Sequence, residues 1–126
     1  MSQPVPKVTA RDVERVVRRE FSPADAPAAF VMLEEYGKKD GHRELARVRM
    51  AVLKLAGGSL ERLKENLALA DQDYRDVLSF AEYPRAFTEI SPSEKDHAKR
   101  ERVEQADWRQ YCAWLAGKAP DHTHRH

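Results

Sequence analysis

The sequence has 126 residues with 22 basic and 21 acidic side chains, so its net charge at neutral pH is close to zero. This length favours a single domain with a buried core, and the charge balance excludes a global field for non-specific binding to nucleic acid or membranes. The lone cysteine, Cys112, excludes an internal disulfide, and the amino-terminal residues lack the apolar core of a signal peptide. No uncharged run approaches the roughly 20 residues of a membrane span. We therefore expect a cytoplasmic protein without a membrane-spanning segment.

The first expected helix follows an extended arm, residues 1–8, in which Pro4 and Pro6 oppose a helical start. Thr9 and Asp12 stand at the N-cap and N3 positions of a capping box, which predicts that the helix begins here. One face of this helix carries its large apolar residues, Val13, Val16, Val17 and Phe21. Because the outer face is charged, this short helix needs packing against the rest of the chain.

Two helices follow, and the second of them is expected to be central. The first begins near Asp25, after a proline-rich turn, and ends at Tyr36 before a glycine. The next, residues 42–56, is apolar around most of its circumference, so other helices should contact it from two sides. Gly57 and Gly58 end this helix and reverse the chain, which predicts an antiparallel hairpin with the helix that follows.

The longest expected helix runs without a break from Leu60 to Glu82, between Ser59 as N-cap and the helix-stopping Pro84. Its apolar residues recur at alternating steps of three and four, as in a heptad seam: Leu60, Leu63, Leu67, Ala70, Tyr74, Val77 and Ala81. The seam keeps its phase across the polar run 71–73, which predicts one continuous rod about 36 Å long.

The last expected helix begins at Ser91, because Ser91, Pro92 and Glu94 suit the N-cap, N1 and N3 positions, and it ends at the glycine before the tail. The tail, residues 118–126, is expected to be disordered. The predicted fold is therefore all-α, with about five helices in a compact bundle around the antiparallel hairpin of the third and fourth helices. This bundle would form one domain over residues 9–117.

The sequence lacks a glycine-rich phosphate loop, paired cysteines, a His-Glu-x-x-His motif and a nucleophile elbow, which are the motifs with the most specific chemistry. Cys112 stands between aromatic residues of a helix and is interpreted as a small core residue. His42 and His97 have no partner at ligand spacing and are expected at the surface. Three alternating histidines in the tail favour adventitious metal binding: His122, His124 and His126. We expect no enzyme, no cofactor and no physiological metal site.

An arginine within the apolar arc of the third helix, Arg49, is expected to form a structural ion pair. A buried guanidinium without a partner is costly, so it should find a carboxylate on a neighbouring helix. The candidates are Asp73, Asp76 and Glu82. The alternative role of these acids, as a metal or acid–base pair, needs a Glu-x-x-His partner that the sequence lacks.

Five basic residues form a basic ridge on and before the third helix: Lys38, Lys39, Arg43, Arg47 and Lys54. Such a ridge suits the phosphate backbone of a nucleic acid or an acidic protein. It is also typical of an ordinary solvated face, and no aromatic residues interleave it for base stacking.

Apolar residues on the outer sides of two helices indicate an interaction surface: Leu69, Phe80, Trp108, Tyr111 and Leu115. Contiguous exposed apolar side chains mark interfaces, because monomers rarely leave them in water. We therefore expect a non-enzymatic interaction or structural module that binds a protein partner or a second copy of itself. The alternative is a small nucleic-acid-associated regulatory protein that uses the basic ridge.

Two stretches, ELARVRMAVLKLAGG and DYRDVLSFAEYPR, together resemble a block found in small uncharacterised bacterial all-helical proteins. The resemblance covers about a third of the chain. It implies an all-helical fold and a bacterial, cytoplasmic origin, and it implies no activity or site residues.

Overall fold

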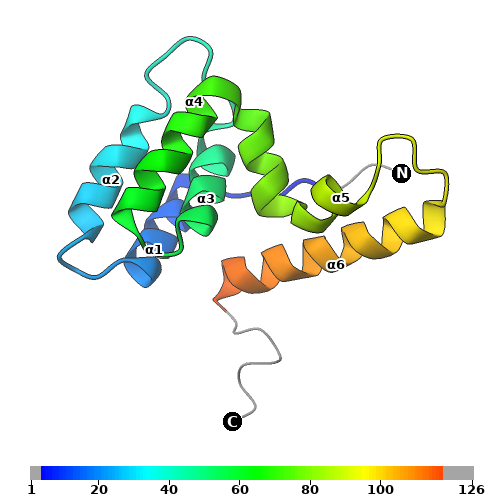
Figure 1. Ribbon diagram of the computed structural model, residues 1–126. Helices are drawn as coiled ribbons and strands as arrows, with labels where there is room; N and C mark the ends of the chain where they lie inside the picture. The colour runs from blue at the N-terminus through cyan, green and yellow to red at the C-terminus, as the bar shows by residue number, and fades with distance from the viewer. Residues whose placement is uncertain (1–3, 118–126) are drawn as a thin grey trace. The chain divides into compact units, whose positions relative to one another are not determined.

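The computed structural model describes residues 4–117, and this part of the chain is all-α, as predicted. It contains six helices, of which five have seven residues or more. Their bounds are α1 Ala10–Glu20, α2 Ala26–Glu35, α3 Leu45–Ala56, α4 Leu60–Glu82, α5 Pro84–Glu89 and α6 His97–Ala116 (Figure 1). The short α5 lies between the fourth and the last predicted helix, in a stretch for which the sequence predicts no helix. The predicted disordered tail, residues 118–126, lies outside the described residues.

Contacts divide the chain into two compact units. The larger unit comprises residues 5–81, which hold α1, α2, α3 and nearly all of α4. The smaller unit comprises Pro4 with residues 82–117, which hold α5 and α6. The expectation of one domain over residues 9–117 stays a prediction.

The predicted capping box starts α1. The Thr9 hydroxyl accepts a hydrogen bond from the Asp12 amide at 3.2 Å, and the Thr9 amide donates to the Asp12 carboxylate at 2.9 Å. These two bonds satisfy amides that have no partner within the helix. The face that α1 buries contains Val13, Val16 and Val17, as the sequence pattern predicts.

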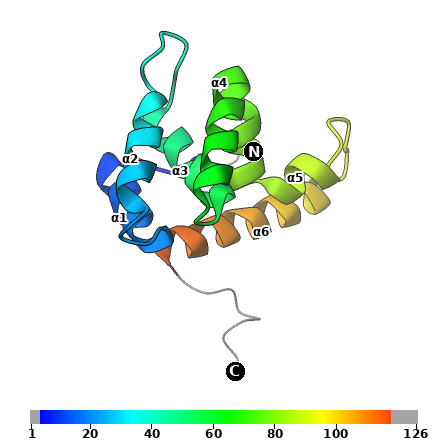
Figure 2. The same cartoon turned by 60° about the vertical axis from the view of Figure 1, so that its left-hand side comes forward.

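The helix α3 is the centre of the larger unit. Its buried residues cover most of its circumference: Val48, Met50, Ala51, Val52, Leu53 and Ala56. It packs against α4 as the predicted antiparallel hairpin (Figures 1 and 2). Gly58 makes the turn possible, because its φ is +83° and a Cβ there would lie 2.7 Å from the carbonyl oxygen of Glu20.

The prediction of an unbroken fourth helix is wrong. Asp73 has non-helical backbone angles, φ −158° and ψ 96°. The ribbon of α4 changes direction along its length (Figure 1). The Asp73 carboxylate accepts a hydrogen bond from the Arg75 amide at 3.0 Å, as an N-cap residue does. The helix therefore restarts after Asp73, although seam residues on both sides of the bend are buried: Leu63, Ala70, Val77 and Ala81.

The smaller unit packs α5 against α6. Its core cluster contains Tyr83, Ala86, Ile90 and Val103, with Trp108 packed against it. Asp107 of α6 is buried, and its carboxylate accepts hydrogen bonds from the amides of Arg85 at 3.2 Å and Ala86 at 2.9 Å. A carboxylate at these amides complements the positive end of α5.

The predicted start of the last helix at Ser91 is wrong. The helix α6 begins at His97, and its N-cap is Asp96, which accepts from the Lys99 amide at 3.0 Å. The Ser91 hydroxyl instead accepts from the Ser93 amide at 3.1 Å and stabilises a turn before the helix. Two capping patterns therefore compete in this stretch, and the later one starts the helix.

Candidate functional site

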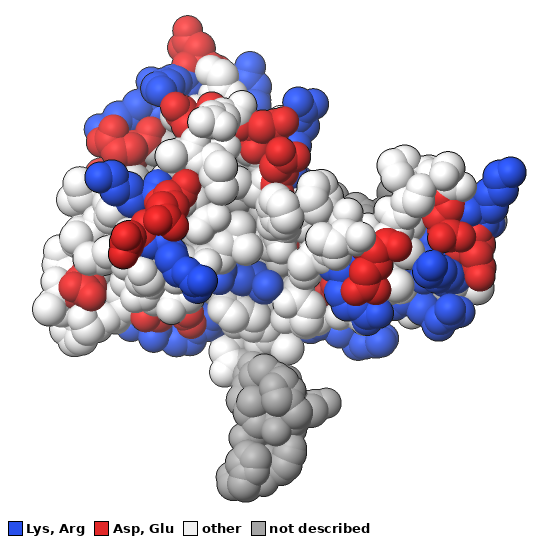
Figure 3. All heavy atoms as spheres, viewed as in Figure 1, with Lys and Arg blue, Asp and Glu red and all other residues white. Residues whose placement is uncertain are grey.

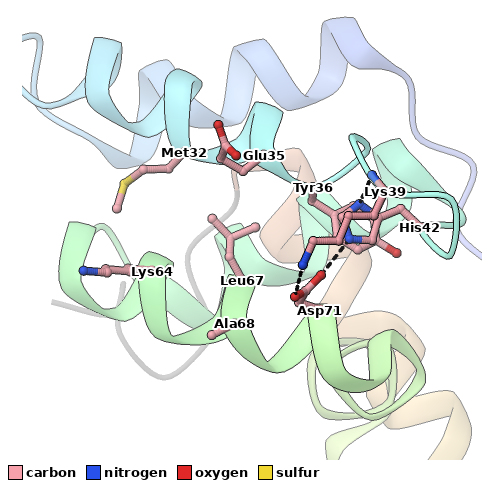
Figure 4. Close-up of a pocket in the computed structure, with 9 residues that line it drawn as sticks. All are labelled: Met32, Glu35, Tyr36, Lys39, His42, Lys64, Leu67, Ala68 and Asp71. Atoms are coloured by element: carbon pink, nitrogen blue, oxygen red, sulfur yellow. Dashed lines mark hydrogen bonds and ion pairs between the residues drawn. The ribbon is translucent and has the colours of Figure 1, made fainter.

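A hollow of the larger unit lies between α2 and α4 and has a volume of about 450 Å³ (Figure 4). We call it the α2–α4 groove. Four residues give it an apolar floor: Met32, Tyr36, Leu67 and Ala68. Its polar lining consists of Glu35, Lys39, His42, Lys64 and Asp71. Mainly apolar hollows of this size with a few convergent polar groups are typical of binding sites.

One end of the groove is closed by His42, whose side chain is only 7% exposed. The imidazole Nδ1 accepts a hydrogen bond from the Gly37 amide at 2.6 Å, and Nε2 lies 2.8 Å from the Asp71 carboxylate. The ring stacks on Tyr36 with 4.2 Å between centroids. We call this arrangement the His42 clip. The expectation that His42 is a surface residue is therefore wrong. The predicted start of the third helix at residue 42 is also wrong, since residues 42–44 belong to the loop and α3 begins at Leu45.

The His42 clip does not provide a general base. Because Nδ1 accepts from a backbone amide, the ring proton belongs on Nε2, where it is donated to Asp71. Both nitrogens are therefore used within the chain, and neither offers a free lone pair to a substrate proton. The clip instead fixes the loop between α2 and α3 against α4.

Tyr36 supports the same loop from inside. Its hydroxyl donates to the Arg43 carbonyl at 2.8 Å and accepts from the Arg43 amide at 3.1 Å. Burial raises the pKa of this hydroxyl above its ordinary value. The floor of the groove is therefore held by a neutral, fully engaged phenol.

The charges of the groove lining are compensated with one exception. Asp71 accepts from His42 and pairs with Lys39 at 2.7 Å, and these hydrogen bonds lower the pKa of its carboxyl, the one from His42 most. Glu35 pairs with Lys38 at 2.9 Å. The side chain of Lys64 makes no ion pair or hydrogen bond within residues 4–117.

The basic ridge is not a row of free cations. All five of its residues interact with other groups of the chain: Lys38, Lys39, Arg43, Arg47 and Lys54. Arg47 and Lys54 are also partly buried. Basic and acidic side chains are intermixed on the visible face of the described residues (Figure 3).

Arg49 finds a backbone partner in place of the expected carboxylate. Its Nε and Nη2 donate to the Tyr36 carbonyl at 3.1 and 2.6 Å, and within the described residues it forms no ion pair. The predicted pairing with Asp73, Asp76 or Glu82 is therefore wrong. The end of α2 leaves carbonyls without helical partners, and the guanidinium satisfies one of them from the side of α3.

The predicted interaction residues fall into both units. In the larger unit, Leu69 is 50% and Phe80 43% exposed, but the bend in α4 separates them, so they do not share one helical stripe. In the smaller unit, Trp108 packs on the core, Tyr111 is buried and Leu115 is partly buried. Tyr111 therefore does not lie on an exposed surface, whereas Cys112, expected in the core, is exposed.

Sequence reasoning missed the groove because its lining comes from three segments. His42 and Asp71 are 29 residues apart, and no spacing rule links them. The one local signal was the polar run that begins at Asp71 on an otherwise apolar seam.

No protein-family model, curated protein or solved structure matches this chain. Among the described residues, no group of three or more histidine, cysteine, aspartate or glutamate side chains is placed to hold a metal ion. Across residues 4–117, no helix combines the length and the apolar character needed to cross a membrane. The tail histidines, for which only adventitious metal binding is expected, lie outside the described residues: His122, His124 and His126.

Proposed function

We propose that the protein is a non-enzymatic, cytoplasmic interaction module that binds a protein partner through the α2–α4 groove. The observation that carries this proposal is an apolar hollow of about 450 Å³ whose walls are fixed by the His42 clip and by Tyr36. Grooves between helices accept the apolar side chains of a partner helix or peptide. A groove that is already formed binds at a lower entropic cost than one that must be ordered.

Two features support this proposal over its rivals. The imidazole of the His42 clip has both nitrogens engaged, which argues against acid–base catalysis in the groove. The residues of the basic ridge are engaged within the chain, which argues against a phosphate-binding track.

The proposal is tested by capture of partners on the tagged full chain in its native cell, followed by calorimetric titration of each purified partner. Ala68→Tyr places a ring in the groove, and Leu69→Tyr places the same ring on the adjacent residue, which does not line the groove. We expect Ala68→Tyr to weaken binding by at least about tenfold and Leu69→Tyr to retain it. Equal binding by the parent and Ala68→Tyr, or loss in Leu69→Tyr alone, would contradict the proposal.

A further inference from the structure

We infer that the partner presents an apolar segment with an acidic side chain at one end, and that this acid pairs with Lys64 at the open end of the α2–α4 groove. This inference rests on the proposed function and adds the chemistry of the partner. It follows from the unpaired charge of Lys64 in the groove lining and from the position of this residue along the groove.

The ammonium group of Lys64 is the charge of the groove lining that has no ionic partner within residues 4–117. Asp71 is matched by Lys39, and Glu35 is matched by Lys38 beside the groove. Lys64 is not matched, since within residues 4–117 neither Glu61 nor any other acid forms an ion pair with it. An occupant that brings a carboxylate to this ammonium gains a charge-assisted hydrogen bond, and one that brings a cation meets repulsion.

The position of Lys64 fixes where that carboxylate must be. Lys64, Leu67, Ala68 and Asp71 follow one another along the groove side of α4, and Figure 4 shows Lys64 at the end away from the clip. Lys64 and Asp71 are seven residues apart on α4, which corresponds to about 10 Å, or two helical turns. The occupant therefore places its apolar side chains over Leu67 and Ala68 and its acid about two turns from the clip.

The small exposed side chain at the middle of this stripe favours a peptide segment. Ala68 lies between Lys64 and Asp71 and leaves room for a backbone to approach α4 closely. The clip presents no free polar group to an occupant, because the Asp71 carboxylate and both imidazole nitrogens are engaged. Recognition at that end is therefore by shape, and recognition at the Lys64 end is by charge.

The inference is tested by panning a phage-displayed library of short random peptides against the full chain, with Ala68→Tyr as the counter-selection. We expect the enriched peptides to combine apolar residues at helical spacing with an Asp or Glu about two turns from one end. Selected peptides are then titrated against Lys64→Glu and against Arg62→Glu. Arg62 is exposed on the same helix and does not line the groove, so it provides the matched charge reversal.

Lys64→Glu should weaken binding of the acidic peptides by about tenfold. Replacement of the peptide's acid by Lys should restore binding to Lys64→Glu. Arg62→Glu should show neither effect. Groove-dependent peptides without an acidic preference, or with equal affinity for Lys64→Glu, would overturn the inference and leave the proposed function standing. A library that yields no groove-dependent peptide would overturn both. Dodecanoate is the last probe: if it bound the groove in place of any peptide, the occupant would be a small amphipathic acid and not a protein.

Discussion

Truncation of Asp107 is expected to destabilise the smaller unit more than any other loss of a single capping residue. Its carboxylate is 1% exposed and accepts from the amides of Arg85 and Ala86, at the start of α5. A hydrogen bond to a charged group contributes about 1.5–3 kcal/mol, and an unsatisfied buried amide costs about 1–3 kcal/mol. Water reaches the exposed Arg85 after truncation but not the buried Ala86. Asp107→Ala should therefore cost about 3–5 kcal/mol.

The assay is urea unfolding followed by circular dichroism, with amide hydrogen exchange at Ala86 as the local readout. Asp107→Asn keeps one acceptor oxygen and should lie between the parent and Asp107→Ala. Asp96→Ala is the control, because Asp96 caps α6 through one exposed hydrogen bond whose loss should cost about 1 kcal/mol. If Asp107→Ala cost no more than Asp96→Ala, the reasoning from burial would be refuted.

Three further perturbations test other parts of the fold. Gly58→Ala should lower the urea midpoint more than Gly57→Ala, because both glycines have positive φ but only at Gly58 does a Cβ meet a backbone oxygen, at 2.7 Å. His42→Ala should lower the free energy of unfolding by about 2 kcal/mol, because it removes the Gly37 hydrogen bond and the aromatic stack. The control, His97→Ala, changes an exposed residue and should alter the free energy of unfolding little. Equal effects of the two variants would contradict the clip. Burial raises the pKa of Tyr83 from 10.0 to about 12, so the contribution of this phenol to stability is constant below pH 10.0 and is lost as the pH rises toward about 12. An absorbance titration of the phenol checks this, and Tyr83→Phe should flatten the fall.

Much of the fold could be predicted where the signals are local. The capping box of Thr9 lies within four residues, and the apolar circumference of α3 follows from its composition alone. The reversal at Gly57 and Gly58 likewise depends on residues that tolerate positive φ. These features depend on residues that are close together in the sequence, so they can be recognised in short stretches of it.

The bend of α4 could not be predicted, because two local rules conflict there. The heptad seam favours continuing the helix, whereas the Asp73 side chain competes for the Arg75 amide and restarts it. The preference of aspartate for N-cap positions favours a new helix start after Asp73, whereas the periodicity of the seam favours one continuous helix. The partner of Arg49 was missed for a related reason, since a backbone carbonyl at a helix end leaves no trace in residue types.

The candidate site was the least predictable feature, because it depends on contacts between distant segments. The His42 clip joins a loop to α4, and Lys64 is singled out only by the pairing of the acids around it. The predicted interaction surface requires continuous helical stripes. The bend separates Leu69 from Phe80, and burial removes Tyr111 from the surface.

The most direct test of the proposed function is nuclear magnetic resonance of the isotope-labelled full chain, titrated with the captured partner or the best selected peptide. If the partner binds in the α2–α4 groove, the amides and methyl groups that shift most belong to Met32, Leu67 and Ala68, and the His42 ring shifts less because it is held in the clip. Largest shifts on the basic ridge or on α6, with Leu67 and Ala68 unchanged, would contradict binding in the groove.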